Sequence, residues 1–238
     1  MDLHEPDAGA AVAEALVAVE TLARALHVTD ARLEPTLDAV VANAAAALPA
    51  AREAGLILLV RGQLVPQALV GQAPKILDRR QQETGEGPCI EAASSQQVII
   101  VSDTSADSRW PRFCAAAQEC GVGAMLCVPL WAGERSMGSL SLYAPGPATF
   151  TQADVRLIEL FATLAALALA DAQRAEQLRE AITSRDLIGQ AKGILMERFK
   201  IDSEAAFGTL VRLSQELNIK LTAVARHIAE SGELPGAP

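Results

Sequence analysis

The sequence predicts an α+β protein: an antiparallel sheet flanked by helices, then a long connecting helix and an all-α bundle of three helices. Three observations predict this class. Five short β-rich runs alternate with helical segments in the first part of the chain, a long helical segment follows from Asp154, and three short amphipathic patterns come last. This order is typical of a sheet covered by helices, joined to a separate helical domain.

The first elements are two helices and a hairpin. Regular spacing of Val, Leu and Ala predicts helices over 11–27 and 33–48. The β-rich runs GLILLV (55–60) and QLVPQALV (63–70) follow, and Arg61-Gly62 between them indicates a hairpin turn. Proline cannot donate to a strand ladder, so Pro66 predicts that the second strand is an edge strand or is bulged.

The middle of the chain alternates helices with strands. A helix over 75–84 is expected to stop at GEGPC, where Gly85, Gly87 and Pro88 force a turn before a short helix that begins near Cys89. Next come a buried strand, a helix from Pro111 to Gly121 and two more strands, in the runs QVIIVSD, RWPRFCAAAQECG, GAMLCVPLW and SMGSLSLYA.

The long helix after Thr151 has two interpretations. Thr151 is its expected N-cap, and a broad apolar face contains Leu157, Leu160, Leu164, Leu167 and Leu178. The helix either packs on its own sheet, or it leaves the first domain, forms a dimer and carries a signal onward. The length beyond Ala170 favours the second interpretation, because that part has no sheet left to cover.

Composition and charge exclude several classes of protein. Half of the 238 residues are hydrophobic, and the formal net charge of −9 argues against a chain that coats nucleic acid by bulk electrostatics. Acidic residues stand where a secretory signal has basic ones, and no apolar run is long enough for a bilayer, so we expect a cytoplasmic protein without membrane contact. The cysteines and histidines lack metal-ligand spacing, which predicts no metal site (Cys89, Cys114, Cys120, Cys127, His4, His27, His227).

The last segment reads as a small bundle of helices over 184–199, 203–217 and 221–230, with Ser203 and Asn218 as expected caps. Phe199 and Phe207 fall on the predicted core stripes, which argues against aromatic base stacking. Seven basic and six acidic residues between 185 and 230 give +1, whereas the remainder has 13 basic and 23 acidic residues, or −10. The basic groups are therefore concentrated in this segment.

The first bundle helix contains two glycines, each of which costs about 1 kcal/mol relative to alanine inside a helix. At 100° per residue, Gly189 shares a strip with Arg185, Lys192 and Met196, whereas Gly193 lies farther from the core. The glycines serve either to let another molecule approach the helix or to admit a neighbouring helix, and the spacing leaves both explanations open.

Two families are suggested by these residues. GEGPCIEA, VSD…DSRWPRFCAAAQECGVGAMLCVPL and GSLSLYA…ATFTQAD resemble the GAF domain, a family of small-molecule, redox or light sensors, over most of 20–172. The segment SRDLIGQAKGILMERF…SEAAFGTLVRLSQELNIKLTAVARHI resembles the ANTAR domain, an RNA-binding antitermination module. The expected organisation is an N-terminal extension (1–19), a GAF-like domain (20–172), a helical linker (173–183), an ANTAR domain (184–232) and a disordered tail (233–238).

The ANTAR resemblance implies binding to paired stem-loops in nascent RNA, which prevents a terminator from forming. Two stem-loops need two equivalent binding faces, so we expect a homodimer. The candidate RNA contacts are Arg185, Gly189, Gln190, Lys192, Arg212, Ser214, Asn218 and Lys220. For Asn218 a capping role is a complete alternative explanation.

The GAF resemblance implies a sensor site for a small-molecule ligand or a redox signal. Positions in the sensor fold suggest a lining of Cys89, Val101, Asp103, Trp110, Phe113 and Val122. The competing functions are a thiol enzyme similar to free methionine sulfoxide reductases and a cysteine-based redox sensor, because Cys89 is expected at a helix N-terminus. The enzyme leaves the C-terminal domain without a purpose, so we expect a regulator and not an enzyme.

Overall fold

A computed structural model describes residues 33–48, 50–60, 63–132, 135–148 and 150–235. The helix predicted over 11–27, the N-terminal extension and the turns at Arg61-Gly62 and Gly133-Glu134 lie outside these residues. The chain divides into two compact units, with the boundary between Ala172 and Gln173.

The first unit is built on a five-stranded antiparallel sheet in the order β2-β1-β5-β4-β3, which confirms the predicted α+β class. The register between β1 and β2 shifts at Leu56/Ile57, opposite Pro66, and β2 is an edge strand. Both structural expectations for Pro66 are therefore confirmed. The strands are β1 (Glu53–Val60), β2 (Gln63–Val70), β3 (Ile99–Val101), β4 (Ala124–Ala132) and β5 (Arg135–Ala144).

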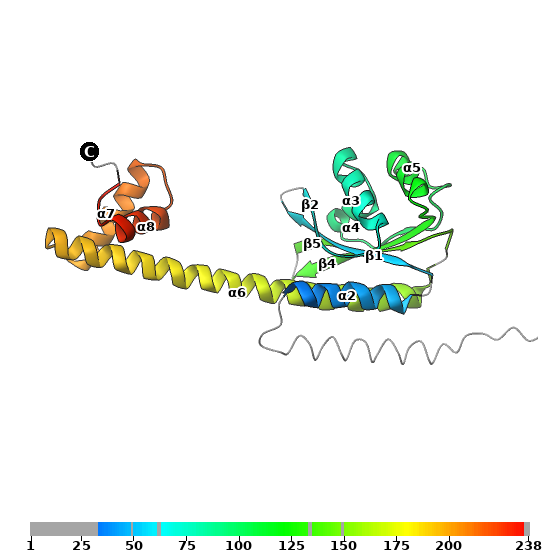
Figure 1. Cartoon of the computed structure of the whole chain (residues 1–238), viewed down its shortest axis with the longest axis horizontal. Coiled ribbons are helices and arrows are strands. Elements are labelled where there is room, and N and C mark those ends of the chain that lie inside the picture. The colour runs from blue at the N-terminus through cyan, green and yellow to red at the C-terminus, as the bar shows by residue number, and fades with distance from the viewer. Residues whose placement is uncertain (1–32, 49, 61–62, 133–134, 149, 236–238) are drawn as a thin grey trace, which may run out of the picture. The chain divides into compact units, whose positions relative to one another are not determined.

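Helices cover both faces of the sheet (Figure 1). Successive side chains of a strand point to opposite faces, and on this sheet both faces are buried in separate clusters. On β5, Leu140 and Leu142 pack in an aliphatic core with α2 and the first part of α6. Ser141 and Tyr143 point the other way, toward α3, α4 and α5. These helices are α2 (Leu33–Ala47), α3 (Ala73–Thr84), α4 (Pro88–Ser95), α5 (Pro111–Glu119) and α6 (Gln152–Phe199).

Helix α6 is one continuous element of 48 residues, so the separate linker and first bundle helix that the sequence suggested are parts of the same helix. Nothing between 173 and 199 breaks it, since the segment has no proline and is rich in Ala, Leu, Glu, Gln and Arg. Thr151 begins the helix as predicted. Its hydroxyl accepts from the Asp154 N–H at 3.2 Å, and the Asp154 carboxylate accepts from the Thr151 N–H at 2.7 Å.

The second unit packs α7 (Ser203–Glu216) and α8 (Leu221–Ser231) against the end of α6. Asp202 caps α7 by accepting from the Ala205 N–H at 2.8 Å, so the prediction of Ser203 as N-cap is wrong by one residue. Asn218 has φ 51°, the left-handed conformation expected of it. Leu234 packs against the bundle core, although we expected it in a disordered tail.

The aromatic residues of the bundle are exposed, which corrects the predicted core. Phe199 and Phe207 are 46 % and 42 % exposed, and Leu217 is also on the surface. On α7 the buried positions are Ala206 and Leu210, with Leu213 packed beside them. The buried face of α7 therefore begins at Ala206, one residue before the predicted core position Phe207. Periodicity did not separate the two because both have helical spacing.

Candidate functional site

The predicted basic strip on α6 lies at the surface of the second unit. Arg185, Gly189 and Met196 are exposed and Lys192 is half-buried. The Lys192 ammonium lies 5.9 Å from the centre of the Phe207 ring on α7. Within the described residues, neither Arg185 nor Lys192 forms an ion pair. The two cationic groups are therefore available to an anionic partner.

Both glycines of α6 face open space. A Cβ atom placed on Gly189 or on Gly193 would have no neighbour within 4 Å among the described residues outside the adjacent helix backbone. A neighbouring helix of the same bundle therefore does not require either glycine. Of the two explanations that the sequence left open, packing within the bundle is excluded for the described part of the chain.

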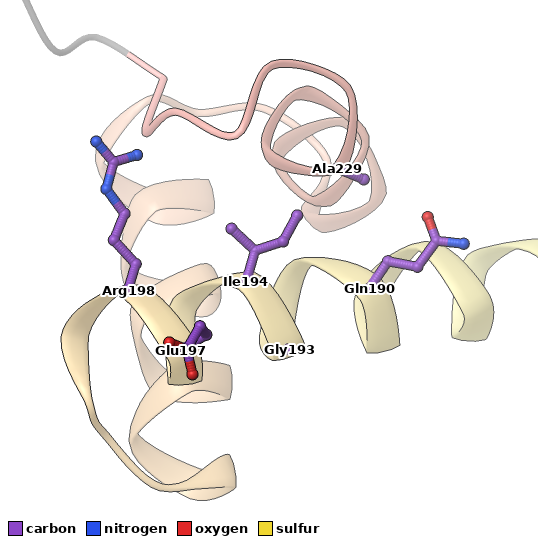
Figure 2. Close-up of a pocket in the computed structure, with 6 residues that line it drawn as sticks. All are labelled: Gln190, Gly193, Ile194, Glu197, Arg198 and Ala229. Carbon is purple, nitrogen blue, oxygen red and sulfur yellow. The ribbon is translucent and has the colours of Figure 1, made fainter.

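A groove runs along α6 on the side of α8 (Figure 2). Ile194 points from α6 toward the helix that carries Ala229, and Gln190 lies one turn before it. Gln190 is thus on the α8 side, whereas Lys192 contacts Phe207 on the α7 side. The sequence-predicted contacts of α6 do not form one patch. The groove is lined by Gln190, Gly193, Ile194, Glu197, Arg198 and Ala229.

The four remaining predicted contacts lie at the end of α7 and the start of α8, and three of them have structural roles. Arg212 pairs with Glu216 at 3.6 Å across one helical turn. The Ser214 hydroxyl donates to the Ile219 carbonyl at 2.6 Å, and Asn218 supplies the left-handed turn between the helices. Lys220 occupies the N-cap position of α8 with an exposed side chain.

In the first unit, five of the six residues suggested for a sensor site belong to one buried cluster: Cys89, Val101, Trp110, Phe113 and Val122. Asp103 lies outside it. Its carboxylate is half-exposed and accepts from the Ser105 N–H at 2.8 Å and from the Ser105 hydroxyl at 2.6 Å, which holds the loop after β3. These hydrogen bonds lower the pKa of Asp103.

A polar group of side chains that the sequence did not reveal lies within this cluster. Cys89 Sγ on α4 is 3.2 Å from the Ser141 hydroxyl on β5 and 3.9 Å from Cys127 Sγ on β4. The Gln81 side chain accepts from the Cys89 N–H at 2.8 Å. Gly87, with φ 148°, makes room for it, because a Cβ there would lie 2.3 Å from the Gln81 oxygen. The GEGPC turn therefore positions Cys89.

Burial and neighbouring charges shift the ionisation of this group. Burial, reinforced by the charge of Cys89, raises the pKa of Asp78 to about 8. The Tyr143 hydroxyl opposes this rise without forming an aligned hydrogen bond, so neither Asp78 oxygen has a partner within the described residues. Hydrogen bonds from Cys127 and then Ser141 lower the pKa of Cys89, whereas burial raises that of Cys127.

No group of three or more His, Cys, Asp or Glu side chains in the described part of the chain is placed to hold a metal ion. Among the described helices, none has the length and apolar character that a bilayer crossing requires.

Comparison with protein families decides the assignment of both units. The family model of the GAF domain matches residues 30–170, and that of the ANTAR domain matches 176–228. The chain belongs to the GAF domain family and carries an ANTAR domain. The sheet with the Cys89 cluster is thus a GAF domain, and the basic strip of α6 lies in the ANTAR domain.

Relatives of this GAF-ANTAR chain include a regulator. The anaerobic nitric oxide reductase transcription regulator NorR of Escherichia coli O1:K1 is 27 % identical over 183 residues, covering 71 % of this chain and 36 % of NorR. The chain therefore spans about a third of the curated relative it matches. With its two domains, this likeness indicates a signal-sensing regulator.

Two solved structures show the same GAF fold. The GAF domain from Acinetobacter phosphoenolpyruvate-protein phosphotransferase aligns with a TM-score of 0.55 and 17 % identity, covering 68 % of this chain and 94 % of that chain. Free methionine-R-sulfoxide reductase from Neisseria meningitidis, solved with its substrate, aligns with a TM-score of 0.54 and 17 % identity, covering 73 % and 98 %. At this identity the likeness concerns the fold alone.

Proposed function

We propose that this regulator binds paired stem-loops in nascent RNA through its ANTAR domain and acts as a transcription antiterminator, under control of the GAF domain. The observation that carries the proposal is the α6 strip, where Arg185 and Lys192 flank a glycine and form no ion pair in the described residues. An RNA backbone can approach Gly189 closely and place phosphates beside both cations.

The other predicted contacts differ in how directly their side chains can reach RNA. Lys220 adds an exposed cation at the start of α8. Gln190 reaches RNA only if the partner also covers the α8 groove, because its side chain lies there. Ser214 and Asn218 act chiefly by holding the turn between α7 and α8. Arg212 must leave Glu216 before it can bind a phosphate.

The exposed Phe207 adds an aromatic contact that the sequence had argued against. Its ring is 42 % exposed and lies beside Lys192, so an unpaired base can stack on the ring while its phosphate meets the ammonium group. Phe207→Leu keeps an apolar side chain but removes the aromatic face. We expect it to weaken RNA binding by roughly 1–3 kcal/mol, and unchanged affinity would remove Phe207 from the contact surface.

A homodimer supplies the two binding faces that two stem-loops need. Helix α6 exposes Leu160 and Leu167 on the GAF unit and Leu178 and Ile182 on the following unit. Large apolar side chains that a chain leaves in water on a long helix are typical of a surface that pairs with a second copy. Two chains joined in this way would hold two hairpins of one transcript.

A selection experiment tests the proposed function. The full chain is bound to RNAs that contain two short hairpins with randomised loops, separated by a spacer of varied length, and the retained RNAs are sequenced. We expect enrichment of shared loop sequences in both hairpins and of a narrow range of spacers. The enriched RNA, placed before a terminator, should then increase read-through in vitro when the protein is added. Retention without any enrichment would contradict the proposal.

A further inference from the structure

Two thiols from different elements meet in the interior of the GAF unit. Cys89 Sγ at the start of α4 lies 3.9 Å from Cys127 Sγ on β4, and both side chains are fully buried. They are 38 residues apart in the sequence, and no spacing rule connects them. Their approach is produced by the packing of α4 on the sheet, where Cys127 pairs with Ser141 across β4 and β5.

The surroundings of the two thiols differ in a way that separates their roles. Cys89 is the second residue of α4, where the helix dipole favours a thiolate, and three polar hydrogens can point at its sulfur, from Cys127, Ser141 and Tyr143. Hydrogen bonds, first from Cys127 and then from Ser141, lower the pKa of Cys89 although its burial acts in the opposite direction, whereas burial raises the pKa of Cys127. Of the two, Cys89 is therefore the better placed to act as a nucleophile, and Cys127 to retain its proton.

We propose that Cys89 and Cys127 form a redox-active pair that an oxidant of the peroxide class converts into an intramolecular disulfide. The Cys89 thiolate attacks one oxygen of hydrogen peroxide, the O–O bond breaks, and the departing hydroxide takes a proton to become water. The resulting Cys89 sulfenic acid is attacked by the Cys127 sulfur, which forms the S–S bond and releases a second water. Overall, two thiols and one peroxide give one disulfide and two waters.

The proton for the departing hydroxide has a source in the same cluster. Asp78 is buried on α3, the charge of Cys89 helps to raise its pKa, and its carboxyl oxygens have no partner in the described residues. With a pKa raised to about 8, this carboxyl is largely protonated at neutral pH. Tyr143, whose pKa is raised by burial, also retains its proton.

The remaining cysteines provide an internal control. Cys120 at the end of α5 is half-buried and so the most accessible thiol, and burial raises its pKa and that of Cys114. If access to solvent alone determined oxidation, Cys120 would react first. If the paired geometry determines it, a small neutral oxidant should modify Cys89 and Cys127 while Cys120 stays reduced.

The test uses the reduced full chain. It is treated with one equivalent of hydrogen peroxide, unfolded in the presence of a thiol-alkylating reagent, and analysed by mass spectrometry before and after proteolysis. We expect two of the four thiols to escape alkylation, a peptide pair linked through Cys89 and Cys127, and full recovery of all four thiols after dithiothreitol. Glutathione disulfide, which is too large for the interior, should react at Cys120 instead.

Two variants separate the steps, and the readout is independent of RNA binding. In Cys127→Ser, dimedone should trap a sulfenic acid on Cys89 and no disulfide should form, whereas Cys120→Ser should behave as the unmodified chain. The inference is overturned if the unmodified chain keeps four alkylatable thiols after peroxide treatment, or if the loss is confined to Cys114 or Cys120. That result stands even if a variant does not fold, because it needs only the unmodified chain.

Discussion

At the scale of single residues, the open side of Gly189 distinguishes a contact surface from a packing defect. A glycine inside a helix lowers its stability, yet no neighbour within 4 Å compensates for it in the described part of the chain. Arg185 and Lys192 lie on the same side of α6 and make the surface around this open space positively charged. The cost of Gly189 is therefore best explained by a partner that approaches the helix backbone.

Replacing Gly189 tests this explanation. Gly189→Leu should weaken binding of the enriched two-hairpin RNA at least tenfold, because its side chain would hold the RNA backbone away from both cations. Gly193→Leu is the matched control on the groove side. Leucine is the better helix former by up to about 1 kcal/mol, so neither variant should lower the melting temperature. Equal RNA affinities of the two variants would contradict a close approach of RNA at Gly189.

Asp78 gives the GAF unit a characteristic dependence on pH. The folded chain holds the carboxyl proton up to a pH near 8, whereas an ordinary aspartate releases it near 3.8. Between these values the folded state binds more protons, so the free energy of unfolding should fall as the pH rises, by at most about 1.4 kcal/mol per pH unit. Asp78→Asn should remove this decline between pH 5 and 6, below the pKa of Cys89, which is about 7.

Tryptophan fluorescence during urea unfolding measures the effect. Both tryptophans, Trp110 and Trp131, lie in the GAF unit, so the signal reports that unit alone. Asp107→Asn is a suitable control, because the Arg109 hydrogen bond lowers the pKa of Asp107 and its stabilising effect is complete above pH 5. An unchanged pH dependence in Asp78→Asn would contradict the protonated state assigned to Asp78.

Periodicity predicted some of the site residues and missed others for a physical reason. Arg185, Gly189 and Lys192 were placed on one side of α6 because residues on a single helix are related by its fixed turn. The exposure of Phe207 and the contact of Cys89 with Cys127 depend on how separate elements pack. The sequence contained one indication of the polar group around Cys89. In SMGSLSLYA, the polar Ser141 lies in the middle of a strand, on the face opposite Leu140.

At the scale of elements, α6 has two apolar faces. Ile158, Phe161, Ala165 and Leu169 pack against the sheet, so the interpretation of α6 as a helix on its own sheet holds for its first part. Leu160 and Leu167 are 48 % and 58 % exposed. The sequence grouped these leucines into one broad face and could not separate the buried positions from the exposed ones, because small alanines carry much of the buried side.

The exposed face predicts the consequence of charged substitutions. Leu160→Glu with Leu167→Glu should convert a dimer into a monomer in light scattering, because four carboxylates would be buried where two helices meet. The fold should be retained, since neither side chain contributes to the core. Val65→Glu on edge strand β2 is the control at a similarly exposed position. A monomeric unmodified chain, or a double variant that remains dimeric, would contradict the assignment.

The continuity of α6 was not predicted, although every local signal was present. The sequence predicted a helix that becomes charged toward 182, with 173–183 as a helical linker, and Ser184 read as the start of a new helix. In the structure the helix continues through both. Charged and polar residues with high helix propensity extend a helix beyond its packed part without any core.

At the scale of the whole molecule, charge is distributed unequally along the chain. The segment 185–230 carries +1 and the remainder −10, so the proposed RNA partner would be repelled less by this segment than by the rest of the chain. Binding should therefore depend on a few cations and be sensitive to salt. Both domains were identifiable from sequence motifs, whereas the contact of Cys89 with Cys127 was not, because it depends on how α4 packs on the sheet.

The affinity of the full chain for the enriched two-hairpin RNA, measured over a series of salt concentrations, tests the central claim most directly. Arg185→Ala with Lys192→Ala should lower the affinity about 100-fold, since hydrogen bonds from charged groups contribute about 1.5 kcal/mol each or more, and should reduce the salt dependence by about two ions. The charge-matched pair Arg174→Ala with Arg179→Ala, on exposed positions of the same helix, should bind as the unmodified chain does. Equal affinity and equal salt dependence of the two double variants would contradict the assignment of the α6 strip as the RNA-binding surface.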